Sequence, residues 1–157
     1  VTFAFRRITR PVRSWQWSLS ALIALLHDLV VPLGILAVLG EFQGVQVTIP
    51  VVVALLTVVG YSVNDTVVVF DRVRENLIKK VGYDFADTVN ISLRQAFSRS
   101  FNTSVTTLFV VVSILLFGGE TLYGFALAMT IGILAGTYSS LFLAPMLLIK
   151  LAKKERG

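Results

Sequence analysis

Residues Val47–Phe70 read VTIPVVVALLTVVGYSVNDTVVVF, and Asp65 is the single charged residue in this stretch. About 20 apolar residues in a helix cross the ~30 Å hydrocarbon core of a membrane, because each residue adds ~1.5 Å. Core helices of soluble proteins are rarely so long and so uniformly apolar. The stretch therefore predicts a transmembrane helix.

The rest of the chain has the same character. Of its 157 residues, 55% are hydrophobic and 15% are charged, and the mean hydropathy is +0.81. Two long windows contain no Lys or Arg, and a short polar turn around Glu41 or Glu120 divides each of them. We therefore expect an all-α membrane protein, a bundle of four transmembrane helices joined by a cytoplasmic helical connector. The expected helices cover residues 17–39, 47–70, 101–117 and 122–151.

The basic residues indicate the orientation of these helices. All 14 Lys and Arg residues fall before the first helix, between the second and third, or at the end of the fourth and after it. By the positive-inside rule, we expect both ends of the chain and the central connector to lie on the cytoplasmic side of the cell (inner) membrane. Because the basic residues then serve topology, no nucleic-acid partner is expected. The expected division is 1–16 (cytoplasmic end of a preceding helix and its loop), 17–70 (two transmembrane helices), 71–100 (connector), 101–151 (two transmembrane helices) and 152–157 (basic tail).

The connector has the pattern of two short helices separated by Gly82. Apolar residues recur at helical spacing before it, and Asp84 is a good N-cap for the helix after it. The connector either folds onto the bundle or provides a docking surface for a cytoplasmic partner. The chain starts at Val1 without an initiator Met, so we expect it to be part of a longer protein.

Composition also limits the chemistry. The chain has no Cys and one His, His27, so disulfides and thiolate sites are excluded and a His-ligated metal is not expected. No nucleophile is paired with a base, and no phosphate-binding loop occurs. We expect neither an enzyme nor a bound cofactor or metal.

Asp65 is the first candidate for function. A charged group inside the membrane costs about 2.5–3.5 kcal/mol on insertion scales, and hydrocarbon favours the neutral form of a carboxylic acid. A membrane carboxyl is therefore a natural proton-binding site. Tyr61 and Ser62 lie one turn earlier on the same helical face, and Asn64 lies on the adjacent one. The alternative is a carboxylate that only ties two helices together.

Arg99 begins the third transmembrane helix near the cytoplasmic boundary. Its side chain either reaches towards Asp65 or extends to the lipid headgroups, as Arg at helix ends often does. Asn102 and Thr106 extend a polar stripe up the same helix, although Thr often serves only helix packing.

Asp28 lies near the middle of the first helix, beside His27 and one turn before Pro32. Adjacent helical residues point about 100° apart, so His27 and Asp28 are not expected to serve one site together. Asp28 is a possible proton relay; the alternatives are a buried hydrogen-bonded pair and a water site.

The last helix carries a ridge of small residues at every fourth position. Such a ridge allows close approach of another helix, so its expected role is packing. The ridge consists of Gly124, Ala128, Gly132, Gly136 and Ser140.

Residues 60–76, GYSVNDTVVVFDRVREN, resemble the signature of the protein-export membrane protein SecF, or of the SecF half of a fused SecDF. Three further stretches resemble the family in the same order, at 24–28 (ALLHD), 117–120 (FGGE) and 136–140 (GTYSS). The resemblance implies helices three to six of a six-helix half of the RND superfamily.

The resemblance also implies a function and partners. The family acts with SecD beside the SecYEG channel and couples proton entry to late stages of preprotein export across the lipid membrane. Asp65 and Arg99 match the family's proton-conducting residues. Two alternatives stay open: an RND-type proton-coupled exporter of lipids or small molecules, and a passive scaffold that stabilises the channel.

Overall fold

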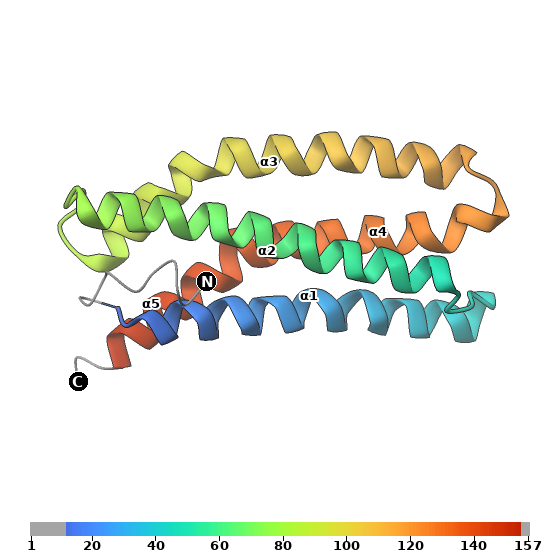
Figure 1. Cartoon of the computed structure of the whole chain (residues 1–157), viewed down its shortest axis with the longest axis horizontal. Coiled ribbons are helices and arrows are strands. Elements are labelled where there is room, and N and C mark those ends of the chain that lie inside the picture. The colour runs from blue at the N-terminus through green and yellow to red at the C-terminus, as the bar shows by residue number, and fades with distance from the viewer. Residues whose placement is uncertain (1–11, 155–157) are drawn as a thin grey trace.

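The computed structural model describes residues 12–154, which form a bundle of long antiparallel helices (Figure 1). Four helical segments are long and apolar enough to cross a membrane. The predicted all-α membrane fold is therefore confirmed. The elements are α1 (Ser14–Gln43), α2 (Ile49–Ile78), α3 (Phe85–Phe117), α4 (Glu120–Tyr138), the π-helical turn η1 (Ser139–Leu143) and α5 (Ala144–Lys154).

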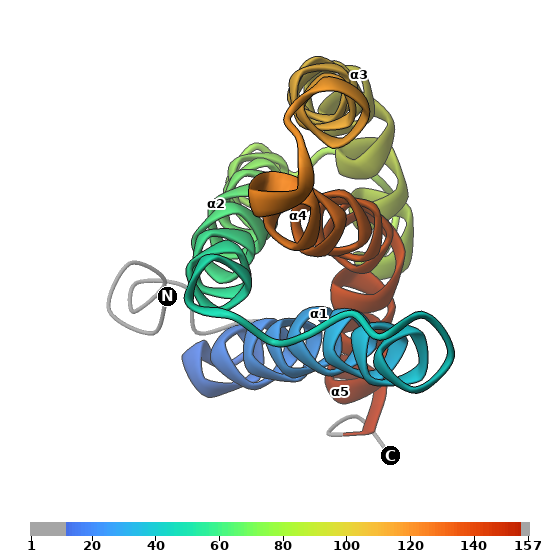
Figure 2. The ribbon, with the colours of Figure 1, turned by 90° about the vertical axis from the view of Figure 1, so that its right-hand side faces the viewer.

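The helix α4 occupies the middle of the bundle, although it comes late in the sequence. It packs against α1, α2 and α3 (Figure 2). In the span formed by α4, η1 and α5, 56% of the most apolar window is buried, against 17% for α3. Consequently α3 lies at the edge of the bundle and leaves most of its surface open.

The connector differs from the prediction. The two short helices expected within 71–100 are continuous with α2 and α3, and α2 ends at Ile78, before Gly82. The reason is a shared apolar core at this end of the bundle, in which Val73 of α2 and Val89 of α3 are fully buried with Trp17 of α1. Asp84 does cap α3, since its carboxylate accepts the backbone N–H of Asp87 at 2.7 Å.

The ridge of small residues on α4 faces α2. A Cβ atom added at Gly132 would lie 2.3 Å from Val58 Cγ2, and one at Gly124 would lie 3.0 Å from Val51 Cγ2. Because no side chain separates them, the backbones of α2 and α4 approach closely at these two positions.

The last transmembrane segment is not one regular α-helix. It widens into the π-helical turn η1 just before Pro145. Proline has no N–H to donate to the carbonyl of Leu141, and its ring crowds that carbonyl, so regular α-helical geometry is disfavoured there. The widened turn places Ser139 and Ser140 in the buried interior.

Candidate functional site

Asp65 lies on α2 and is buried where α2, α3 and η1 meet. Its Oδ1 accepts a hydrogen bond from Ser100 Oγ of α3 at 2.7 Å, and its Oδ2 accepts one from Ser140 Oγ of η1. The side chain is 8% exposed. Hydroxyl groups from two other elements therefore hold this carboxylate inside the bundle.

Asp28 is held in a similar way on α1, and it is completely buried. Its Oδ2 accepts hydrogen bonds from Ser62 Oγ of α2 and, at 2.5 Å, from Ser139 Oγ of η1. His27 Nδ1 lies 2.9 Å from Asp28 Oδ1. The prediction that His27 and Asp28 do not share a site is therefore wrong, because rotation of the two side chains overcomes the angle between their Cα–Cβ bonds.

The two carboxylates belong to one cluster. Ser139 and Ser140, which bind Asp28 and Asp65 respectively, are consecutive residues of η1. Ser62, which binds Asp28, lies three residues before Asp65 on α2. We call this set the aspartate–serine cluster; it consists of Asp28, Ser62, Asp65, Ser100, Ser139 and Ser140.

A second group of hydroxyls lies about one helical turn away from Asp65. The hydroxyl groups of Tyr61 and Thr137 lie 3.0 and 2.7 Å from Ser104 Oγ, so α2, α3 and α4 are joined again at this level. Tyr61 is thus part of the polar interior, but it bonds to Ser104 and not to Asp65. These hydroxyls continue the polar interior of the bundle away from the cluster.

The polar stripe expected on α3 faces outwards. The side chains of Asn102 and Thr106 are exposed, and the Thr106 hydroxyl bonds to backbone carbonyls of its own helix. Asn64 of α2 is exposed too. The structure therefore does not bring these three residues to Asp65. The inward stripe of α3 consists instead of Ser92, Ala96, Ser100 and Ser104.

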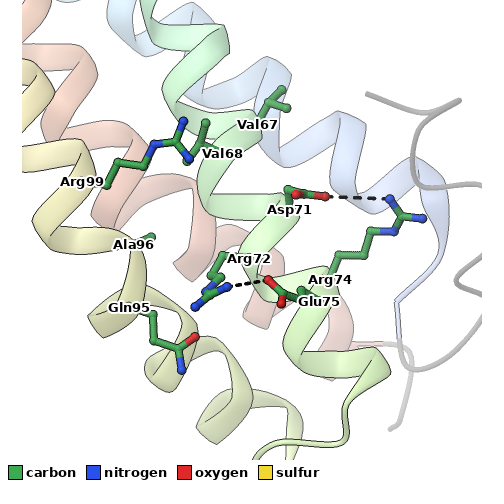
Figure 3. A pocket seen from close by; sticks show the side chains of 9 residues that line it. All are labelled: Val67, Val68, Asp71, Arg72, Arg74, Glu75, Gln95, Ala96 and Arg99. Carbon is green, nitrogen blue, oxygen red and sulfur yellow. Dashed lines mark hydrogen bonds and ion pairs between the residues drawn. The ribbon is translucent and has the colours of Figure 1, made fainter.

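Arg99 points into an open groove between α2 and α3 (Figure 3). The groove has a volume of about 460 Å³, and two ion pairs lie along it, Arg72–Glu75 at 2.5 Å and Arg74–Asp71 at 3.8 Å. Within residues 12–154, no ion pair joins Arg99 to Asp65, whose oxygens are bound by Ser100 and Ser140. Arg99 and Ser100 are neighbours in sequence, yet one faces the groove and the other the interior.

Sequence reasoning missed Ser100, Ser104 and Ser139 as members of the polar interior. A usable pattern existed on α3, where Ser92, Ala96, Ser100 and Ser104 recur at every fourth position. A row of small residues at this spacing indicates a buried helix face, just as a row of large apolar residues does.

The hydrogen bonds of the aspartate–serine cluster can serve both the charged and the neutral form of its two aspartates. A serine hydroxyl can donate to a carboxylate and accept from a carboxylic acid, so both forms of each aspartate have partners. In the part of the chain that the structure describes, no group of three His, Cys, Asp or Glu residues is arranged to hold a metal ion.

Comparison with known proteins identifies clear relatives. The family described as "Protein export membrane protein SecD/SecF, C-terminal" matches residues 10–154. The protein translocase subunit SecF of Thermobaculum terrenum is 48% identical over 155 residues, which cover 99% of this chain and 48% of that protein. SecF of Pseudomonas aeruginosa is 43% identical over 135 residues, covering 86% of this chain and 43% of its own length. The chain thus spans about half the length of these curated relatives.

Solved structures agree with this result. A crystal structure of SecDF from Thermus thermophilus, described as a translocon-associated membrane protein, matches with a TM-score of 0.78 and 39% identity. The match covers 94% of this chain and 19% of that one. A SecDF structure in a super-membrane-facing form matches with the same TM-score and 38% identity, covering 91% and 19% of the two chains.

Proposed function

Because this chain belongs to the SecD/SecF family of protein export membrane proteins, we propose that it is part of a Sec translocase subunit. In this proposal the subunit uses the proton-motive force to promote late stages of protein translocation, together with SecD, the SecYEG channel and the preprotein. The relatives are named as translocase subunits, and the role proposed here is transport and not enzymatic catalysis.

The observation that carries this proposal is the buried carboxylate of Asp65, which accepts hydrogen bonds from two serine hydroxyls. Moving one proton across a membrane potential of 100 mV releases about 2.3 kcal/mol. Protonation of Asp65 removes the charge that Ser100 of α3 and Ser140 of η1 now solvate. Since those bonds join three helices, loss or reversal of them changes helix packing. Asp65 is therefore the proposed proton relay, with Arg99 as its second charged member.

The groove between α2 and α3 supports SecD as the partner. Asn64, Arg99 and Asn102 are exposed on the helices that border it, and polar groups of a transmembrane segment are costly against lipid. We propose that transmembrane helices of SecD cover this face, where Arg99 meets the polar groups of its partner, and that lipids cover the remaining apolar surface.

The orientation follows from the charges. α1 begins, and α2 and α5 end, at the same end of the bundle (Figure 1). Arg72 and Lys79 lie near the C-terminal end of α2, and Lys150 lies in α5. We propose that this end faces the cytoplasm and that the membrane is the inner (cytoplasmic) membrane, by the positive-inside rule.

The test compares Asp65→Asn with a control on α1, Glu41→Gln. Glu41 is exposed near the end of α1, so the control removes a carboxylate charge outside both the cluster and the groove. The full-length protein is assembled with SecD in membrane vesicles under an imposed proton gradient, and proton entry and preprotein export are measured together. We expect Asp65→Asn to abolish both while the complex stays assembled, and Glu41→Gln to retain both. Normal proton entry and export in Asp65→Asn would overturn the proposal and favour a passive scaffold.

A further inference from the structure

A second buried carboxylate, Asp28, has no part in the proton path proposed above. We propose that Asp28 is a second proton-binding residue of this bundle, and that Ser139 and Ser140 of η1 couple its protonation to that of Asp65. The biological role of this coupling rests on the proposed function, whereas the experiment that tests it does not. The step is reversible proton binding: one proton adds to a carboxylate oxygen, gives the neutral acid and later leaves.

The surroundings of Asp28 suit both forms of the group. From α1, His27 Nδ1 lies 2.9 Å from Oδ1, and from α2 and η1 the hydroxyls of Ser62 and Ser139 donate to Oδ2. His27 is the only basic side chain bonded to Asp28 among residues 12–154. Because the other two partners are neutral hydroxyls, protonation of Asp28 leaves no buried cation without its counter-charge.

His27 also connects Asp28 with the surface of the bundle. Its side chain is 31% exposed, whereas that of Asp28 is fully buried. The imidazole ring lies beside the Tyr138 ring, with centroids 6.3 Å apart. The imidazole is therefore the group through which the buried carboxylate meets the outside of the bundle.

Each serine of η1 has a second acceptor for its hydroxyl proton. Ser139 Oγ lies 2.5 Å from Asp28 Oδ2 and 3.2 Å from the carbonyl oxygen of Gly136. Ser140 Oγ is bonded to Asp65 Oδ2 and lies 3.2 Å from the carbonyl oxygen of Thr137. A serine hydroxyl has one proton to donate. When an aspartate becomes protonated and donates to its serine, the serine hydroxyl turns to the carbonyl three residues earlier.

This reversal affects the other aspartate because both serines belong to one short turn. Ser139 and Ser140 are consecutive, so a change in the backbone of η1 that strengthens one carbonyl contact also moves the other hydroxyl. π-helical turns inside α-helices occur frequently at functional sites. The turn is thus a single element whose arrangement is biased by both carboxylates, which is the physical requirement for coupling between two sites.

Infrared titration of the full-length protein, assembled with SecD, tests this directly. The carboxylic-acid bands are followed against pH, and Asp28→Asn and Asp65→Asn assign one band to each aspartate. Coupled equilibria are reciprocal. We therefore expect Asp28→Asn to change the proton affinity of Asp65 by about fivefold or more, and Asp65→Asn to change that of Asp28 by the same factor.

The role of η1 is tested with Ser139→Ala and its matched control Ser20→Ala. Ser20 is also fully buried, but among residues 12–154 its hydroxyl bonds only to the carbonyls of Gln16 and Trp17 in its own helix. We expect Ser139→Ala to change the proton affinities of both aspartates, and Ser20→Ala to change neither. A band of Asp28 that does not titrate, or titration of Asp65 that is the same in Asp28→Asn as in wild type, would overturn the inference. These measurements need no proton flux, so they are separate from the vesicle assay of the proposed function.

Discussion

Replacement of Gly132 by Ala gives the sharpest test of the described packing. The added Cβ would lie 2.3 and 2.6 Å from the two Cγ atoms of Val58 and 3.0 Å from its Cβ, whereas ordinary contact begins at 3.4 Å. Rotation of the valine side chain cannot relieve this overlap, because its Cβ is itself too close. The backbones of α2 and α4 must therefore separate by a few tenths of an ångström at this level.

The expected cost follows from two opposing terms. Overpacking of a close-packed interior costs about 1–3 kcal/mol, while Ala is favoured over Gly in a helix by up to about 1 kcal/mol. We therefore expect Gly132→Ala to lower the free energy of unfolding by about 1–2 kcal/mol. A Cβ at Gly34 of α1 would meet no atom within 4 Å, so Gly34→Ala is the matched control and should be neutral or slightly stabilising.

The assay is reversible unfolding of the purified full-length protein in detergent micelles, with each variant compared with wild type. The double variant Gly132→Ala with Val58→Ala removes both clashing Cγ atoms. It should therefore be more stable than the sum of the two single effects predicts. If Gly132→Ala were as stable as Gly34→Ala, the close approach of α2 and α4 described here would be wrong.

Two further predictions concern the open groove and the end of the bundle beneath it. Arg99→Ala should change the free energy of unfolding by no more than about 0.5 kcal/mol, because the arginine is exposed. The same variant should reduce proton entry in vesicles that contain SecD. A large loss of stability would show that Arg99 instead supports the fold. Asn76→Ala should destabilise the bundle by about 1–3 kcal/mol, because the Asn76 amide donates to Ser92 Oγ at 2.8 Å and Gln95 Oε1 at 2.9 Å and so joins α2 to α3. Detergent unfolding measures this second effect, and Asn90→Ala, at an exposed position of α3, is its control.

The four helices were predictable because membrane insertion depends on the summed hydropathy of each segment and not on tertiary contacts. Asp65 and Asp28 were conspicuous for the same reason, since charge is rare in such segments. The second transmembrane helix was expected to end at residue 70, whereas α2 continues to Ile78. An apolar pattern that includes Val73 marks a buried helix face, but it does not show whether the chain breaks between that face and the preceding transmembrane helix.

The partners of the two aspartates were harder to predict. On α3, the larger polar residues Asn102 and Thr106 were predicted to form the polar stripe near Asp65. The buried polar residues of this helix are instead the smaller Ser100 and Ser104. Sequence spacing gives the face that residues share, but it does not say which neighbouring helix that face meets. The widened turn at Ser139 depends on the local effect of Pro145 on a helix that otherwise reads as continuous.

The central position of α4 has a consequence for biosynthesis. During translation, α1, α2 and α3 leave the ribosome before the helix that packs against all three of them. Until residues 139 and 140 are made, Asp28 and Asp65 each lack a hydroxyl donor that they have in the finished bundle. A nascent chain that stops at α3 therefore carries two carboxyl groups in the membrane without their full set of hydrogen-bond donors, and arrival of the last helix supplies the missing ones.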